Sequence, residues 1–218
     1  MAKTLDRDAL TSKALKSALK LASKTAWTDV TLRDIAEEAG IDLEAFYGQI
    51  DKSSVLDALD VWADKAMSED APDMKDTPRE RLFDAIMLRF ERLETQRAGA
   101  LSMLAGRSRQ PGDFAHRLRQ RRKTAKWAMV AAGLDSGAPV ALGAMRVGLI
   151  RAISKAEAAW REDDSGDFAR TMATLDGELI NIEERLDQLS RLRKRFRRWP
   201  NMAASSRPEG PQAETSEA

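Results

Sequence analysis

Two short helix signals joined at a glycine, within residues 31–50, constrain the fold of this chain more than any other feature. The run TLRD at residues 31–34 has the form of a capping box. In that motif Thr31 accepts a hydrogen bond from the Asp34 amide, and the Asp34 carboxylate accepts one from the Thr31 amide. The helix that begins there is predicted to stop at Gly40, because glycine readily takes the left-handed conformation that ends a helix.

A third, short helix is predicted directly after this turn. Asp42 is positioned to cap it, and Phe46 is expected to face the core. The side chains of Leu43, Tyr47 and Gln49 are then expected to point partly outward. Two short helices joined by a glycine turn form a helix-turn-helix, whose outer side can lie against a nucleic-acid groove.

Apolar residues recur at helical spacing through most of the remaining chain. One helix with this spacing is recognised from Leu15 before the helix-turn-helix, and another begins near Asp51 after it. Residues 67–78 carry acids and prolines without an apolar period, so we predict a linker there. Five further helices are predicted over residues 79–95, 97–106, 112–132, 138–160 and about 168–198.

These elements predict an all-α protein of two domains. Residues 1–66 form the three-helix helix-turn-helix domain, and residues 79–199 form a helical bundle for dimerisation and ligand binding. The two long C-terminal helices suit a four-helix interface between two copies of the chain. Residues 200–218 are rich in Ser, Pro and Glu, and we predict that they are disordered.

Composition excludes several classes of function. The 218 residues contain no cysteine, which rules out disulfides, thiolate metal sites and cysteine nucleophiles. No phosphate-binding loop, nucleophile elbow or metal-ligand spacing occurs, and the single histidine, His116, has no carboxylate or serine partner at helical spacing. We therefore expect no enzyme activity, no metal and no cofactor. Without a signal-peptide core or an apolar stretch of membrane-spanning length, a cytoplasmic location is expected.

Charge is unevenly distributed although the net charge is only +1. Residues 107–126 carry eight basic side chains against the single acid Asp113, whereas residues 1–56 carry eight basic and nine acidic ones. The basic run either touches phosphates or lipid head groups, or is a solvated helix face with some arginines paired to acids elsewhere.

The run TLRDIAEEAGIDLEAFYGQIDKSSVL, residues 31–56, resembles the signature of the TetR family of transcriptional regulators. The resemblance implies a homodimer that places its two third helices in successive major grooves of a double-stranded operator and leaves when a ligand enters the C-terminal body. This chain departs from the family pattern in the acids Asp42 and Glu44 at the start of the third helix. Phosphate positioning is assigned to Lys24, Thr31, Tyr47 and Lys52, and base contact to Asp42, Leu43, Glu44, Ala45 and Gln49.

A second stretch, residues 150–180, resembles the C-terminal helices of the lipid-binding accessory proteins of ubiquinone biosynthesis, which have the TetR fold. The resemblance rests on Trp160, Asp164, Ser165, Asp167, Thr171, Leu175, Asp176 and Ile180. It implies that the basic, amphipathic residues 189–199 contact a membrane surface, the alternative being a solvated basic helix end.

Aromatic and methionine side chains in the bundle are candidates for lining a cavity that binds a small apolar or lipid-like ligand, or are simply core. They are Phe83, Met87, Phe90, Met103, Trp127, Met129, Met145 and Trp160. Three functions stay open from the sequence. The first is a ligand-responsive DNA-binding repressor, the second is a lipid-binding accessory protein that does not bind DNA, and the third is a structural interaction module.

Overall fold

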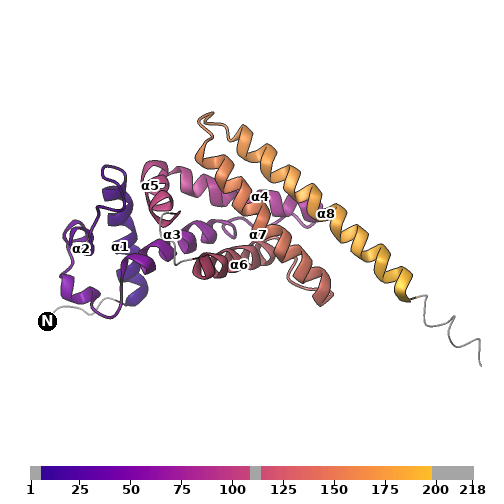
Figure 1. Cartoon of the computed structure of the whole chain (residues 1–218), viewed down its shortest axis with the longest axis horizontal. Coiled ribbons are helices and arrows are strands. Elements are labelled where there is room, and N and C mark those ends of the chain that lie inside the picture. Colours follow the sequence, from indigo (N-terminus) through magenta and orange to yellow (C-terminus); the bar gives the residue numbers. More distant parts are fainter. Residues whose placement is uncertain (1–5, 109–113, 198–218) are drawn as a thin grey trace, which may run out of the picture.

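A computed structural model describes residues 6–108 and 114–197, and within these residues the chain is entirely helical, without a strand (Figure 1). The helices, in chain order, are α1 (Arg7–Ala22), α2 (Leu32–Ala39), the short 3-10 helix η1 (Leu43–Phe46), α3 (Lys52–Ala66), α4 (Pro78–Glu94), α5 (Arg97–Ser108), α6 (Phe114–Ala131), α7 (Pro139–Arg161) and α8 (Ala169–Arg197).

The helix-turn-helix lies at one end of an elongated molecule, and the long helix α8 runs along the opposite side (Figure 1). Helices α7 and α8 pack side by side and make the most extensive contact between any two elements. Helix α3 leads out of the helix-turn-helix and contacts α1 as well as α4, α5 and α6. Helix α3 therefore connects the helix-turn-helix to the body.

Local sequence signals set several helix starts. Thr77 closes a capping box with Glu80 ahead of α4, and Pro78 occupies the first helical turn, where its missing N–H costs nothing. Asp51 closes a similar box with Ser54 at the start of α3. Pro139 begins α7 in the same way as Pro78 begins α4.

The all-α prediction is confirmed, and the predicted body helices agree with the structure to within a few residues. The first helix was placed too late, because it begins at Arg7 rather than near Leu15. Leu10 and Ala14 extend its apolar stripe towards the N-terminus, and both side chains are buried. Two turns of α1 therefore gain tertiary contacts that the shorter pattern does not include.

Close packing between α1 and α5 depends on two glycines. A Cβ atom on Gly99 would lie 2.3 Å from the carbonyl oxygen of Leu19, and one on Gly106 would lie 2.5 Å from Cδ1 of Trp27. The Trp27 amide also donates to the Ser102 hydroxyl at 3.0 Å. The turn after α1 is thus held directly against the body of the protein.

One continuous buried core runs through the described residues, from Leu10 in α1 to Ile182 in α8. The division into domains at residues 67–78 stays a prediction, and the core crosses it. In the part of the chain that the structure describes, no helix is both long and apolar enough to cross a membrane. The predicted disordered tail, residues 200–218, lies outside the described residues.

Candidate nucleic-acid interface

The capping box at the start of α2 forms as the sequence predicts. The Thr31 amide donates to Asp34 Oδ2 at 2.8 Å, and the Asp34 amide donates to Thr31 Oγ1 at 3.1 Å. Hydrogen bonds from the Thr31 amide and hydroxyl lower the pKa of Asp34, so the carboxylate stays ionised near the positive end of the helix. The N-terminus of α2 is therefore rigidly defined, and Thr31 is exposed there.

The turn between α2 and η1 also matches the prediction. Gly40 has φ 61° and ψ 43°, the left-handed conformation, and the Ile41 amide donates to the Ala36 carbonyl at 3.0 Å. Phe46 is only 2% exposed and anchors the second element in the core. The chain therefore leaves α2 sharply, and η1 is fixed against α2 from its inner side.

The third helix differs from the prediction in two respects. It is a single turn of 3-10 helix rather than an α-helix, and the Asp42 side chain makes no capping hydrogen bond. Gly48, at φ 70°, turns the chain only two residues after Phe46. The segment between Asp42 and Gly48 is too short for an α-helix to complete its hydrogen-bonded turns.

The outer side of η1 and the turn after it presents a continuous set of exposed side chains, which we call the tip surface. Tyr47 is 89% exposed and Leu43 is 37% exposed. The only ionisable groups on this surface besides Tyr47 are two carboxylates, and the nearest exposed basic residues along the chain are Arg33 before it and Lys65 after it. The tip surface consists of Asp42, Leu43, Glu44, Ala45, Tyr47 and Gln49.

Lys52 is not available to a phosphate in the way the resemblance implies. Its ammonium donates to the carbonyls of Trp27 at 2.8 Å and Val30 at 2.5 Å, and lies 4.7 Å from the centre of the Trp27 ring. Burial lowers the pKa of Lys52, although the charges of Asp29 and Asp34 oppose this shift. The side chain joins the turn between α1 and α2 to the start of α3. Lys52 is therefore not one of the residues of the candidate interface.

Two solved structures are similar to this one over most of the chain. The crystal structure of the TetR transcriptional regulator from Nitrosomonas europaea ATCC 19718 gives a TM-score of 0.65, covering 80% of this chain and 98% of that one, at 21% sequence identity. The structure of a TetR transcriptional regulator from Rhodococcus sp. RHA1 gives 0.58, covering 78% and 93%, at 14% identity. This chain has the TetR fold.

No family model and no curated protein matches the sequence. The similarity to the TetR structures is one of fold, and the fold expected from residues 31–56 is thereby confirmed. The comparisons lend no support to the ubiquinone-biosynthesis resemblance, which stays a hypothesis. Three of the residues that carry it, Trp160, Ser165 and Thr171, have structural roles at the turn from α7 to α8.

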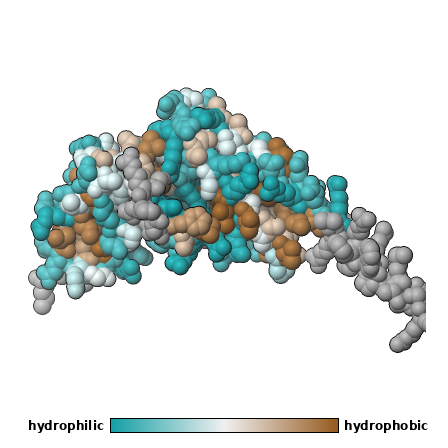
Figure 2. All heavy atoms as spheres, in the orientation of Figure 1, coloured by the Kyte–Doolittle hydropathy of each residue, from teal (hydrophilic) through white to brown (hydrophobic). Residues whose placement is uncertain are grey.

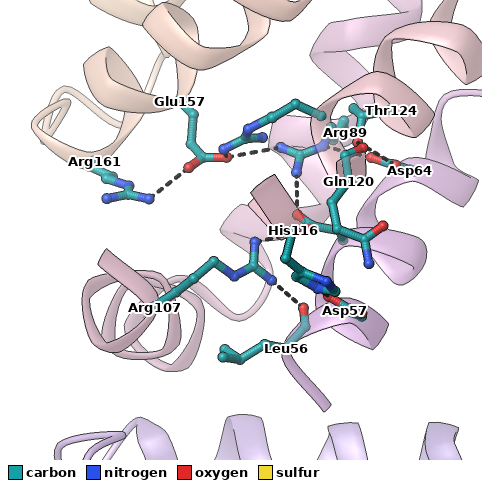
Figure 3. Close-up of polar contacts among 12 residues, drawn as sticks. Leu56, Asp57, Asp64, Arg89, Arg107, His116, Gln120, Thr124, Glu157 and Arg161 are labelled. Carbon is teal, nitrogen blue, oxygen red and sulfur yellow. Dashed lines mark hydrogen bonds and ion pairs between the residues drawn. The ribbon is translucent and has the colours of Figure 1, made fainter. Parts of the chain in front are cut away.

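Within the TetR fold, a cluster of buried charges joins α3 to the body, and it was not predicted from the sequence (Figure 3). Arg89 of α4 donates from Nε to Asp64 at 2.8 Å and from Nη2 to Asp60 at 3.1 Å, and its side chain is 1% exposed. Arg107 of α5 donates to the second oxygen of Asp60 at 2.7 Å. Thr124 of α6 donates to Asp64 at 2.7 Å.

Glu157 of α7 completes this cluster. It accepts from Arg121 and, at 2.7 Å, from Arg161, and it lies 3.7 Å from Arg89. Burial alone would raise the pKa of Glu157, but the arginine charges outweigh burial and hold that pKa well below its usual range. Arg107 and Arg121 belong to the basic run of residues 107–126, so part of that run is paired within the body.

His116 has a partner that helical spacing could not reveal. Its Nε2 lies 2.7 Å from Asp57 Oδ1, and the two residues are separated by 59 positions along the chain (Figure 3). No carboxylate lies at helical spacing from His116, as the sequence indicated, and its partner comes from another helix instead. The pair joins α6 to α3 at the surface.

Most of the predicted ligand-lining residues are packed in the core. Phe90, Met103 and Trp160 are fully buried, and the Trp160 Nε1 donates to Glu94 at 2.8 Å. Phe83 and Met87 line a surface groove of about 600 Å³ beside α4. The other predicted residues, Trp127, Met129 and Met145, line neither this groove nor the hollow of about 550 Å³ next to it.

The membrane-contact prediction for residues 189–199 lies largely outside what the structure describes. Leu189 is 40% exposed on α8, whose backbone continues to Arg197. The side chains of residues 192–199 are outside the described part of the chain.

Proposed function

We propose that this protein is a homodimeric, DNA-binding transcriptional regulator of the TetR type, which acts as a repressor and responds to a small ligand. The observation that supports DNA binding best is the exposure of Tyr47, at 89%, on a tip held by buried Phe46. Aromatic side chains usually bury most of their surface, and a tyrosine presents a hydroxyl that suits a phosphate oxygen. The exposed tip surface, together with the N-terminus of α2, is the part of the helix-turn-helix that would lie against DNA.

The acidic character of the tip shapes the kind of DNA binding expected. Phosphate neutralisation supplies most of the non-specific affinity of DNA-binding proteins, and the tip surface has no basic residue. Carboxylates such as those of Asp42 and Glu44 can accept from the exocyclic amine of cytosine. We therefore expect weak binding to random DNA and dependence on specific base contacts.

Dimerisation is proposed through the outer side of α7 and α8. Val140 and Val147, seven residues apart on α7, are 74% and 67% exposed. On the face shown in Figure 2, hydrophobic side chains gather over the end of the molecule formed by these two helices. Two copies packed there would give four long helices at one interface, which buries apolar surface that a single chain leaves in water.

Selection from a library of random double-stranded DNA tests the proposal, followed by fluorescence anisotropy on the selected sequence. We expect a specific sequence to emerge and Tyr47→Ala to weaken binding about ten-fold, equal to about 1.4 kcal/mol. Phe114→Ala is the matched control, because it removes a ring that is 70% exposed in the body. Failure to enrich any sequence, or equal loss in both variants, would contradict DNA reading by the tip surface.

A reporter gene placed behind the selected sequence tests the sign of regulation. Repression predicts higher reporter expression when the protein is absent or carries Tyr47→Ala. Unchanged expression would contradict the regulatory role. It would not contradict DNA binding, which the selection experiment tests separately.

A further inference from the structure

A continuous groove runs along the outer side of the body, between the loop of residues 67–77, α4 and the start of α8. It combines the two hollows of about 550 and 600 Å³, which share Asp76, Phe83, Asp84 and Met172 among their lining residues. Each volume lies within the range that holds a drug-sized molecule. We call this feature the α4–α8 groove.

The walls of the α4–α8 groove carry far more acid than base. Two arginines line it, Arg79 and Arg81, and Arg79 already lies 3.9 Å from Asp176. The lining acids are Asp70, Asp73, Asp76, Glu80, Asp84, Glu91, Asp167 and Asp176. Burial raises the pKa of Asp84, and the neighbouring charges of Asp76 and Glu80 raise it further. These carboxylates repel one another, so a positively charged group placed among them would be stabilised.

The inner surface of the groove is apolar. Phe83 and Met87 come from α4, Met172 comes from the first turn of α8, and Phe168 directly precedes that helix. Phe168 has φ 59°, the only positive value at a non-glycine residue in the described chain. Aromatic and thioether side chains accommodate varied apolar shapes and contact cations favourably. The groove thus combines an apolar surface with a rim of carboxylates.

A buried arginine without a carboxylate partner provides a second and independent sign of a ligand. Arg81 lines the groove with only 8% of the residue exposed. Its Nη1 lies 3.0 Å from the Met74 sulfur, a weak acceptor, and its buried Nε has no hydrogen-bond partner in the structure. No described carboxylate pairs with it, in contrast to buried Arg89. A buried donor without an acceptor is costly, and a ligand that entered the groove and supplied an oxygen to this guanidinium would relieve that cost.

We propose that the α4–α8 groove binds a cationic amphiphile, with its apolar body on Phe83, Met87 and Met172, its positive head between Asp76 and Asp84, and an acceptor oxygen facing Arg81. The inference deepens the proposed function, since it names the chemical class of the ligand that the regulator senses. An anionic amphiphile is disfavoured, because the rim acids outnumber the groove's bases.

Matched eight-carbon probes test the proposal by calorimetry without DNA present. We expect octyltrimethylammonium to bind at least ten-fold more tightly than octanoate, with uncharged octanol in between. The double variant Asp76→Asn/Asp84→Asn should weaken the cation about ten-fold and leave octanol unchanged, since only charge is removed. Glu183→Gln, on the exposed side of α8, is the matched control and should change neither affinity.

Arg81→Met tests the acceptor separately with octyl-dimethylglycine, a zwitterion that carries a quaternary ammonium and a carboxylate. The unsubstituted protein should bind this probe more tightly than octyltrimethylammonium, and Arg81→Met should remove that preference. Folding should survive, because the variant removes a buried unpaired charge and keeps an apolar chain of similar length, and circular dichroism melting checks this.

Tighter binding of octanoate than of the cation, or equal cation affinity in the double variant, would overturn the assignment of ligand class. Because these titrations contain no DNA, failure of DNA binding would not affect them. If both proposals hold, octyltrimethylammonium should lower the affinity for the selected DNA in the unsubstituted protein and not in the double variant.

Discussion

The ammonium of Lys52 lies 4.7 Å from the centre of the Trp27 ring and donates to the Trp27 carbonyl at 2.8 Å. A second hydrogen bond of 2.5 Å reaches the Val30 carbonyl. One side chain therefore joins the start of α3 to the turn that precedes α2, and it holds the orientation of the helix-turn-helix relative to the helix that enters the body.

Replacing Lys52 should affect stability rather than phosphate binding. Lys52→Met removes the donors and keeps the apolar stem, so we expect the free energy of unfolding to fall by about 1–2 kcal/mol in urea titrations. The slope of DNA affinity against salt concentration should not change. Exposed Lys24 provides the contrast, since Lys24→Met should leave stability intact and reduce that slope by about one. A smaller slope of DNA affinity against salt concentration for Lys52→Met would mean that Lys52 does contact a phosphate.

The contact between α1 and α5 should not tolerate a methyl group at Gly99. A Cβ there would meet backbone of Leu19 at 2.3 Å, so Gly99→Ala should lower the free energy of unfolding by about 2–3 kcal/mol. Gly143→Ala is the control within α7, measured in the Val147→Glu background so that the proposed dimer interface does not contribute, because a Cβ at that position has no neighbour within 4 Å in a single chain. It should stabilise the protein by about 1 kcal/mol through helix propensity. Equal effects at the two positions would contradict the close packing.

Removing one arginine from the buried charge cluster should lower the free energy of unfolding, because a carboxylate would then stay buried without its partner. Arg89→Met leaves Asp64 without its arginine, and we expect a loss of about 3–5 kcal/mol in the free energy of unfolding. Arg151→Met is a suitable comparison, because Arg151 pairs with Glu178 while its own side chain is 55% exposed. That substitution should cost less than about 1 kcal/mol. A small effect for Arg89→Met would mean that water solvates the cluster.

The turn before α8 should lose stability in acid. Hydrogen bonds from the Ser165 hydroxyl and from the Thr171 amide and hydroxyl hold the pKa of Asp163 well below its usual range. A carboxyl whose folded pKa is depressed stabilises the fold above its unfolded pKa, and that contribution is lost as pH falls through the folded pKa. The melting-temperature difference between the unsubstituted protein and Asp163→Asn should therefore be greatest near neutral pH and shrink below about pH 4. A constant difference across this range would contradict the assignment.

The exposed valines of α7 should be required for assembly. Val147→Glu places a charge on the outer side of α7. If the dimer forms as proposed, sedimentation equilibrium should show a dimer for the unsubstituted protein and a monomer for this variant. Val61→Glu on α3 is the control, since Val61 is also exposed, at 49%, and lies outside α7 and α8. A dimer that persists in Val147→Glu would place the interface elsewhere.

The sequence by itself determined the features that depend on neighbouring residues. The capping box of Thr31, the left-handed turn at Gly40 and the inward position of Phe46 all follow from local hydrogen bonding and helical spacing, and the structure confirms each of them. The helix order of the body was also predictable, because apolar residues repeat along it at helical spacing. These hydrogen bonds and this spacing involve residues only a few positions apart, so they can be recognised in a single sequence.

Only the tertiary structure decided the contacts between residues that lie far apart in the chain. Lys52 bonds back to a turn 22 and 25 positions away, and His116 meets Asp57 across 59 positions. The α4–α8 groove likewise brings together acids from a loop and two helices. No local pattern encodes these pairings, because they depend on how whole helices pack, and that packing is set by the summed burial of the core.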